Sequence, residues 1–207
     1  MATYSREQIK NSVKAKGYKY FTEGIYNVNI IGIRNSNNNG KVTNKFDDLI
    51  TVSYKCEHDG WIYNEYPCTT DPGDDWMDNP MSPNKGCAVL KPDQYRGSHK
   101  LRLHRGQYLA LGQKSPVTVY RDNNRNDKYE FDEASCDTGL FGINIHRATK
   151  YAGKTSTNVD KWSAGCQVIA SNDDWHAFLD ICQMAREEWG NSFTYTLIES
   201  NDINGSI

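Results

Sequence analysis

Short stretches of β-branched and aromatic residues recur along the chain from residue 25 onwards, and turn-forming clusters separate them. The stretches cover residues 25–34, 49–54, 61–66, 107–112 and 116–121. The clusters at residues 35–40, 71–73 and 122–127 are rich in Asn, Asp, Gly and Pro. This pattern is typical of antiparallel sheets. It predicts a mainly β fold, of the sandwich or barrel kind, with a few helices.

The last third of the chain predicts two more strands. Residues 141–146 alternate in polarity, with Phe141 and the other apolar residues on one face. Asn144 and His146 then share the opposite, polar face. Residues 193–198 form the final apolar stretch and are expected to be the last strand.

Two segments carry helix signals. Residues 171–189 place apolar side chains at helical spacing, and Ser171 is suited to cap the helix. At the N-terminus, Ser5-Arg6-Glu7-Gln8 has the form of a capping box. The helix that follows has few apolar residues, Ile9 and Val13 among them. We therefore expect residues 1–24 to be a helical extension that is dispensable to the core of one domain, residues 25–207.

Length and charge exclude several classes of protein. A chain of 207 residues suits one domain of ordinary size. Its 24 Lys and Arg against 26 Asp and Glu lack the basic excess that a nucleic-acid binder needs. No apolar run approaches the roughly 18 residues of a membrane span. The N-terminus lacks the apolar segment of a secretory signal, so we expect synthesis in the cytoplasm.

The six cysteines raise the question of disulfides or a bound metal. A chain of this length needs no disulfide cross-links for stability, and the lack of a secretory signal favours free thiols over disulfides. Zinc sites usually contain close C-x-x-C pairs, and the sequence has none. The loose grouping of Cys56, His58 and Cys68 is the remaining zinc alternative.

The strongest candidate chemistry involves His146 and Cys166, which follows Ser163-Ala164-Gly165. A thiol with a pKa near about 8.5 is mostly protonated at pH 7, so a cysteine nucleophile needs a base. Gly165 permits a tight turn before the thiol, where backbone amides can form an oxyanion hole. The alternative is that Cys166 is only a small residue packed in the core and that His146 is only a solvated side chain.

These two blocks resemble the signature of the L,D-transpeptidase catalytic domain family (YkuD-type), a His followed after a variable loop by Ser-x-Gly-Cys. Here His146 takes the first position and Ser163-x-Gly165-Cys166 the second. The resemblance covers residues 100–170 and implies a mainly β catalytic domain that acts on peptidoglycan stem peptides. It also implies that Cys166 is the acyl-accepting nucleophile and that His146 is the general base and then the general acid.

Two positions depart from the family pattern. The family commonly has Gly after the His, where this chain has Arg147, and Arg two residues after the Cys, where this chain has Val168. In the family that Arg is associated with structure or with a substrate carboxylate, and Arg147 is our candidate to replace it. Trp162, Asn144 and Gln167 are the other candidate substrate-binding residues beside the two blocks.

Two further segments, residues 94–99 and 103–106, concentrate His, Arg and Tyr. Arg96 and His104 suit a carboxylate-rich peptide, because Arg pairs bidentately with carboxylates. A solvated face around a hairpin explains these segments equally well. A metallopeptidase that uses His99 and His104 is a further alternative, although the chain has no supporting acidic motif.

The segment from residue 122 to residue 133 has the spacing of a calcium loop. Oxygen-bearing side chains fall at positions 1, 3, 5, 9 and 12 of such a loop. These side chains belong to Asp122, Asn124, Asn126, Glu130 and Glu133. Position 6 is Asp127 rather than Gly, and the flanks read as strands. A hairpin turn rich in Asn and Asp is therefore the preferred interpretation, with calcium as the alternative.

We expect a cysteine peptidase that cleaves L,D bonds in peptidoglycan stem peptides through a thioester, without a cofactor. An L,D-endopeptidase or L,D-carboxypeptidase is favoured over a transpeptidase, which uses an amine acceptor. A wall-binding or structural protein without activity is the alternative from another class. The lack of a signal or wall anchor favours a phage lysis enzyme or an injected effector that reaches the wall after release or delivery.

Overall fold

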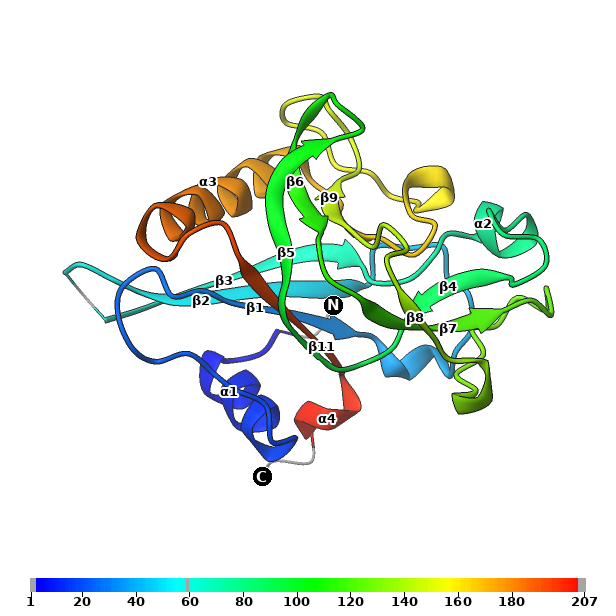
Figure 1. Cartoon of the computed structure of the whole chain (residues 1–207), viewed down its shortest axis with the longest axis horizontal. Helices are drawn as coiled ribbons and strands as arrows, with labels where there is room; N and C mark the ends of the chain where they lie inside the picture. The colour runs from blue at the N-terminus through cyan, green and yellow to red at the C-terminus, as the bar shows by residue number, and fades with distance from the viewer. Residues whose placement is uncertain (1–2, 59, 205–207) are drawn as a thin grey trace.

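Eight strands wind into a closed barrel, and a three-stranded sheet lies beside it (Figure 1). This computed structural model describes residues 3–58 and 60–204. In order round the barrel the strands are β1 (Asn29–Arg34), β11 (Phe193–Glu199), β5 (Gln94–His104), β6 (Tyr108–Gln113), β9 (Ile145–Arg147), β10 (Gln167–Ile169), β3 (Gly60–Thr69) and β2 (Asp48–Cys56). The small sheet has the order β4 (Cys87–Leu90), β7 (Val117–Asp122) and β8 (Asp137–Gly139).

The helices are short except for one. They are α1 (Arg6–Ala15), α2 (Asp74–Asp78), α3 (Asn172–Trp189) and α4 (Asn201–Asn204), with 3-10 turns η1 (Ser36–Asn38), η2 (Glu133–Ser135) and η3 (Asp160–Trp162). No helix in the described ranges has both the length and the apolar character that a membrane span requires. The prediction of a mainly β fold with a few helices is confirmed.

The connectivity of the barrel differs from the antiparallel sheets that the turn pattern predicts. β1 pairs in parallel with β11, and β9 pairs in parallel with β10. Parallel partners are joined by long connections, so no turn signal in the sequence marks them. The long helix α3 lies between β10 and β11 in the chain and packs its apolar face on the barrel, with Phe178 edge-on to Tyr66.

The N-terminal helix α1 has the predicted capping box, in which Ser5 and Gln8 exchange side-chain and backbone hydrogen bonds. Ile9 and Val13 are 1% and 0% exposed and pack against the outer face of the barrel, including Ile31. Both side chains belong to a hydrophobic cluster that is separate from the barrel core. That this segment is dispensable to the core stays a prediction.

A cluster of charged groups is buried at one end of the barrel interior. Arg34 is 2% exposed, and its Nε lies 2.7 Å from Oδ1 of Asp71. The Asp48 carboxylate accepts hydrogen bonds from the backbone amide and the hydroxyl of Thr70. Burial raises the pKa of Asp48 to about 8 and that of Asp71 to about 6, while the Arg34 charge acts to lower the pKa of Asp71. The turn at residues 69–73 thus supplies both Thr70 and Asp71 to this charged cluster.

All six cysteines are free. Cys56 pairs with Gly60 at one end of the β2–β3 ladder, and Cys68 pairs with Asp48 at the other end. The two thiols are separated by the length of the ladder, on the order of 25 Å. The zinc grouping of these cysteines with His58 is therefore wrong.

Candidate active site

The parallel pair of β9 and β10 brings the two predicted catalytic segments side by side. Val168 lies opposite His146, and Gln167 lies opposite Ile145. Ile145 is buried in the barrel core, and side chains alternate between the two faces of a strand. His146 and Cys166 therefore share the outer face of the barrel, although 19 residues separate them in the chain.

The turn before Cys166 depends on Ser163 and Gly165. The Ser163 hydroxyl accepts from the Gly165 amide at 3.1 Å and donates to the Cys166 carbonyl at 2.7 Å. Gly165 has a φ of 120°, and a Cβ at this position would collide with the carbonyl oxygen of Ala88. Both residues thus shape the turn that presents the thiol, and Ser163, 0% exposed, does not reach the surface.

The His146 imidazole is held in one tautomer. Its Nδ1 donates to the backbone carbonyl of Arg147 at 2.8 Å, so Nε2 is left as the proton acceptor. The pKa of His146 is lowered to about 4, mainly by burial, and the charges of His104 and Arg105 act in the same direction. The rings of His104 and His146 stack with their centroids 4.5 Å apart. His146 is therefore a neutral base at pH 7, and its orienting partner is a carbonyl rather than a carboxylate.

The Cys166 thiol rests in its protonated form. Its Sγ donates to the Gly142 carbonyl at 3.3 Å, and burial raises its pKa. The backbone amide of Asn144 and the charge of Arg105 act in the opposite direction, because both favour the thiolate. The thiol and the imidazole are therefore both neutral at rest, which differs from a preformed thiolate–imidazolium pair.

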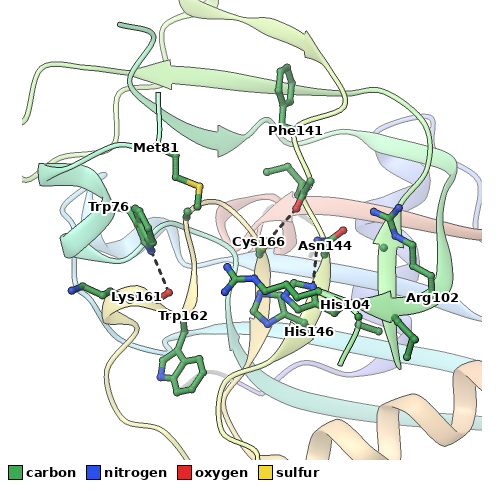
Figure 2. A pocket seen from close by; sticks show the side chains of 18 residues that line it. Trp76, Met81, Arg102, His104, Phe141, Asn144, His146, Lys161, Trp162 and Cys166 are labelled. Carbon is green, nitrogen blue, oxygen red and sulfur yellow. Dashed lines mark hydrogen bonds between the residues drawn. The ribbon is translucent and has the colours of Figure 1, made fainter. Parts of the chain in front are cut away.

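His146 and Cys166 open into one cavity of about 480 Å³. The predicted residues Asn144, His104 and Trp162 line the same cavity. Figure 2 shows Cys166, Asn144, His104 and His146 grouped together, with Trp162 to one side. The amide of Asn144 is fixed by the backbone N–H of Gln113, which donates to its oxygen, and its nitrogen donates to Nδ1 of His104 at 3.5 Å.

Several residues that line the cavity were not predicted as site residues. They are Trp76, Met81, Arg102, Arg105, Phe141 and Lys161. They come from α2 and the loop after it, from the β5–β6 hairpin, from the segment between β8 and β9, and from η3. Two sequence signals point to some of them: Arg105 lies in the segment of residues 103–106, and Arg102 alternates with His104 on a single strand.

Three predicted substrate-binding residues are not among those that line this cavity. Gln167 points into the barrel, where it donates to the carbonyl of Thr70 and accepts from the hydroxyl of Tyr195. The Arg147 guanidinium lies 4.2 Å from the centroid of the Tyr108 ring, outside the cavity lining. Arg96 stacks over Phe21 in a different hollow, beside Trp189. Strand parity directs Gln167, and stacking on Phe21 directs Arg96, away from Cys166, so these two assignments are wrong. The role of Arg147 stays a prediction, because its partner Tyr108 packs against His104 of the cavity, with the ring centroids 5.3 Å apart.

The metallopeptidase alternative fails on the same strand geometry. His99 is 0% exposed inside the barrel, where one ring nitrogen contacts the carbonyl of Ile143 at 2.9 Å. His104, on the same strand, faces the cavity outside the barrel. The two imidazoles therefore do not converge on one metal position.

Phe141 departs from the face that the alternation of residues 141–146 predicts. Only residues from Ile145 onwards form a strand, and Gly142 has a φ of 77°. The left-handed residue breaks the two-residue period, so Phe141 lines the cavity together with Asn144.

The oxygen-bearing side chains of the loop at residues 122–133 are used within the protein. The Asp122 carboxylate accepts from the backbone amides of Asn124 and Glu130, as in an Asx turn. Asn126 donates to the Glu130 carboxylate, and Glu133 pairs with Lys91. The geometry favours the hairpin-turn interpretation over a calcium loop.

The lowered pKa of His146 has a measurable consequence. An ordinary histidine is half protonated near pH 6.5, whereas His146, with a pKa of about 4, remains neutral below that pH. We expect 15N-detected imidazole titrations to show His146 as the Nδ1–H tautomer down to about pH 5. If His146 is a base, kcat/KM should stay constant down to about pH 5 and fall as its protonation begins near pH 4. A His146 titration midpoint near 6.5 would contradict this geometry.

The two sequence blocks that resemble the L,D-transpeptidase signature meet in space. His146 and Cys166 open into one cavity, and Ser163 and Gly165 form the turn behind the thiol. Comparisons with protein-family models, with curated proteins and with solved structures found no match to this chain. The assignment of a function therefore depends on this geometry and on the two blocks.

Proposed function

We propose that this protein is a cysteine peptidase that cleaves L,D peptide bonds in peptidoglycan stem peptides, with Cys166 as nucleophile and His146 as base. The observation that carries the proposal is the placement of both groups on one cavity, with Nε2 of His146 left free by the Nδ1 bond to Arg147. The resemblance of the two blocks to the L,D-transpeptidase family supplies the substrate class. The enzyme acts on the wall after release or delivery.

The proposed reaction has two proton-balanced steps. In the first, Nε2 of His146 takes the thiol proton, and the sulfur of Cys166 attacks the carbonyl carbon on the L-centre side. His146 then gives that proton to the departing amine, which leaves a thioester on Cys166. In the second step His146 takes a proton from water, the hydroxide attacks the thioester, and the released thiolate recovers the proton.

The charges around the cavity favour water over an amine as the acceptor. Arg102, Arg105 and Lys161 line the cavity, and no described lining residue is a carboxylate. An acceptor amine arrives mostly as an ammonium ion, which the three cations repel. Water carries no such penalty. We therefore favour hydrolysis over cross-link formation.

Incubation with purified sacculi, followed by mass analysis of the soluble products, tests the proposal. We expect stem peptides shortened at an L,D bond, with each cleavage adding the mass of one water. New cross-linked muropeptides would instead support the transpeptidase. Unchanged sacculi with a fully active preparation of the protein would contradict both.

One observation favours the alternative of a wall-binding protein without activity. The Cys166 thiol has a raised pKa and is bonded to the Gly142 carbonyl, which are features of an inert cysteine. Alkylation with iodoacetamide discriminates between the two functions. A catalytic Cys166 should react faster than Cys56 and Cys136, which are also partly exposed, whereas equal rates together with binding to sacculi would favour the binder.

A further inference from the structure

We propose that Arg102 and Arg105 form an anion-binding subsite beside Cys166, which selects substrates with a free C-terminal carboxylate next to the bond that is cleaved. The cleavage specificity rests on the proposed function, and the subsite itself does not. In terms of that function, the enzyme is a carboxypeptidase rather than an endopeptidase.

The first support is the imbalance of charge. Within the described chain, neither arginine forms an ion pair or a side-chain hydrogen bond, and no carboxylate lines the cavity. Lys161, the third cation, lies 3.8 Å from a carboxylate oxygen of Asp75, which is not among the lining residues. Figure 2 shows Lys161 on the opposite side of the cavity from Arg102. The β5–β6 side therefore carries two positive charges that have no internal partner.

The second support is the space that the neighbouring strand leaves for Arg102. On β6, the residues that face the cavity are Ala110 and Gly112, the two smallest types. A Cβ at Gly112 would collide with Nε of Arg102. The missing side chain lets Arg102 lie across β6 towards the cavity, where its guanidinium remains exposed to an incoming group.

The third support is the position of Arg105 relative to the reacting groups. Arg105 lines the same cavity as Cys166 and His146, and its charge acts to lower the pKa of both groups. Arg105 and Gly106, with φ values of 50° and 71°, are the two central residues of the β5–β6 turn, which the bond from the Gln107 amide to the His104 carbonyl closes. The turn places Arg105 at the end of the hairpin that borders the cavity.

These features together specify the ligand. Arginine binds carboxylates through two parallel hydrogen bonds. No Asp or Glu among the described residues lines the cavity and competes for the two guanidinium groups. Consecutive residues of a peptide lie 3.8 Å apart at their Cα atoms, so a carboxylate that reaches Arg105 while the scissile carbonyl lies at Cys166 is close to that bond. The terminal carboxylate of a one-residue leaving group is the substrate anion nearest to that bond, and we assign it to the two arginines because they line the same cavity as Cys166.

A pair of alkylating reagents tests the subsite without any need for turnover. Iodoacetate and iodoacetamide both react by attack of the sulfur on the methylene carbon with loss of iodide, and they differ in the carboxylate. We measure the rate of iodoacetate divided by the rate of iodoacetamide at Cys166, by peptide mass analysis. We expect this ratio to fall at least about threefold in Arg105→Gln, and also at high salt, where charges are screened. Cys56 of the same molecule is the reference thiol. An unchanged ratio in both Arg105→Gln and Arg102→Gln would overturn the subsite.

Two synthetic stem peptides, one with a terminal carboxylate and one with a terminal carboxamide, test the specificity. We expect the free acid to be cleaved with a KM at least about tenfold lower, and Arg102→Gln and Arg105→Gln to remove that difference. Arg96→Gln, which lies in a separate hollow, is the matched control and should keep it. A peptide that is amidated only on a side-chain carboxylate, and keeps its terminal carboxylate, shows which of these two carboxylates the arginines bind.

The outcomes distinguish the two proposals. Equal cleavage of acid and carboxamide would overturn the carboxypeptidase assignment and leave the peptidase intact. No cleavage of either peptide, together with a preference of Cys166 for iodoacetate, would overturn the peptidase and leave the subsite standing.

Discussion

Replacement of Cys166 by alanine should lower turnover of stem peptides at least about a thousandfold, because the acyl-enzyme requires the sulfur. Of the described cysteines, Cys166 alone lines the cavity, so no other thiol can take over the attack. The thiol is partly exposed and makes one weak hydrogen bond, to the Gly142 carbonyl, so its removal should change the free energy of unfolding little. Activity on purified sacculi and urea unfolding measure the two effects.

Cys182→Ala is the matched control. Cys182 is 0% exposed on the face of α3 that packs against the barrel core. Its truncation should cost about 0.5–3 kcal/mol of stability and leave the activity per folded molecule unchanged. A Cys166→Ala protein that keeps full activity would refute the thiol mechanism, whatever the behaviour of Cys182→Ala.

Replacement of Arg34 by methionine should cause the largest loss of stability, about 3–5 kcal/mol. Arg34 is 2% exposed and lies 2.7 Å from the Asp71 carboxylate and 3.4 Å from that of Glu199. Its removal leaves a buried carboxylate without a counter-charge, which is more costly than the loss of the attraction alone. Urea unfolding at pH 8 measures the effect, and Lys85→Met, which breaks an exposed pair with Asp137, should cost no more than about 1 kcal/mol.

The pH dependence of this variant gives a sharper test. In the intact protein the charge of Arg34 acts to lower the pKa of Asp71, which burial raises to about 6. Without Arg34 the pKa of Asp71 should rise further, so the carboxyl becomes neutral as the pH falls. The destabilisation should therefore be smaller at pH 5 than at pH 8. An equal loss of stability at both pH values would show that Asp71 is not the group left unpaired.

The secondary structure was predictable where local signals are strong. The capping box at Ser5 and the N-cap at Ser171 both form, because each is set by hydrogen bonds within one turn of helix. The strand β5 was missed as a strand, since its eleven residues include Arg96, Lys100 and other polar side chains. Its polar residues are tolerated because they face outwards or, like His99, bond inside the barrel.

The candidate site was only partly predictable for a similar reason. Residue types and spacing singled out His146 and Cys166, and the turn that Gly165 allows follows from its missing side chain. The assignment of Gln167 to the cavity was wrong, because the face of a three-residue strand depends on its register with β9 rather than on its own pattern. Arg96 was misplaced because a basic side chain in a polar segment gives no indication of which hollow it borders.

The sequence by itself determined the local conformations of this protein and the chemical types of its reactive groups, because both depend on residues within a few positions of one another. The parallel pairing of β9 with β10 places His146 and Cys166 on one face, and only the closed barrel decides it. The tertiary structure also decides the cavity. Ala110 and Gly112 line it together with His146 only because the β5–β6 hairpin lies beside β9. Contacts between distant segments depend on how the whole core packs, and no local pattern encodes them.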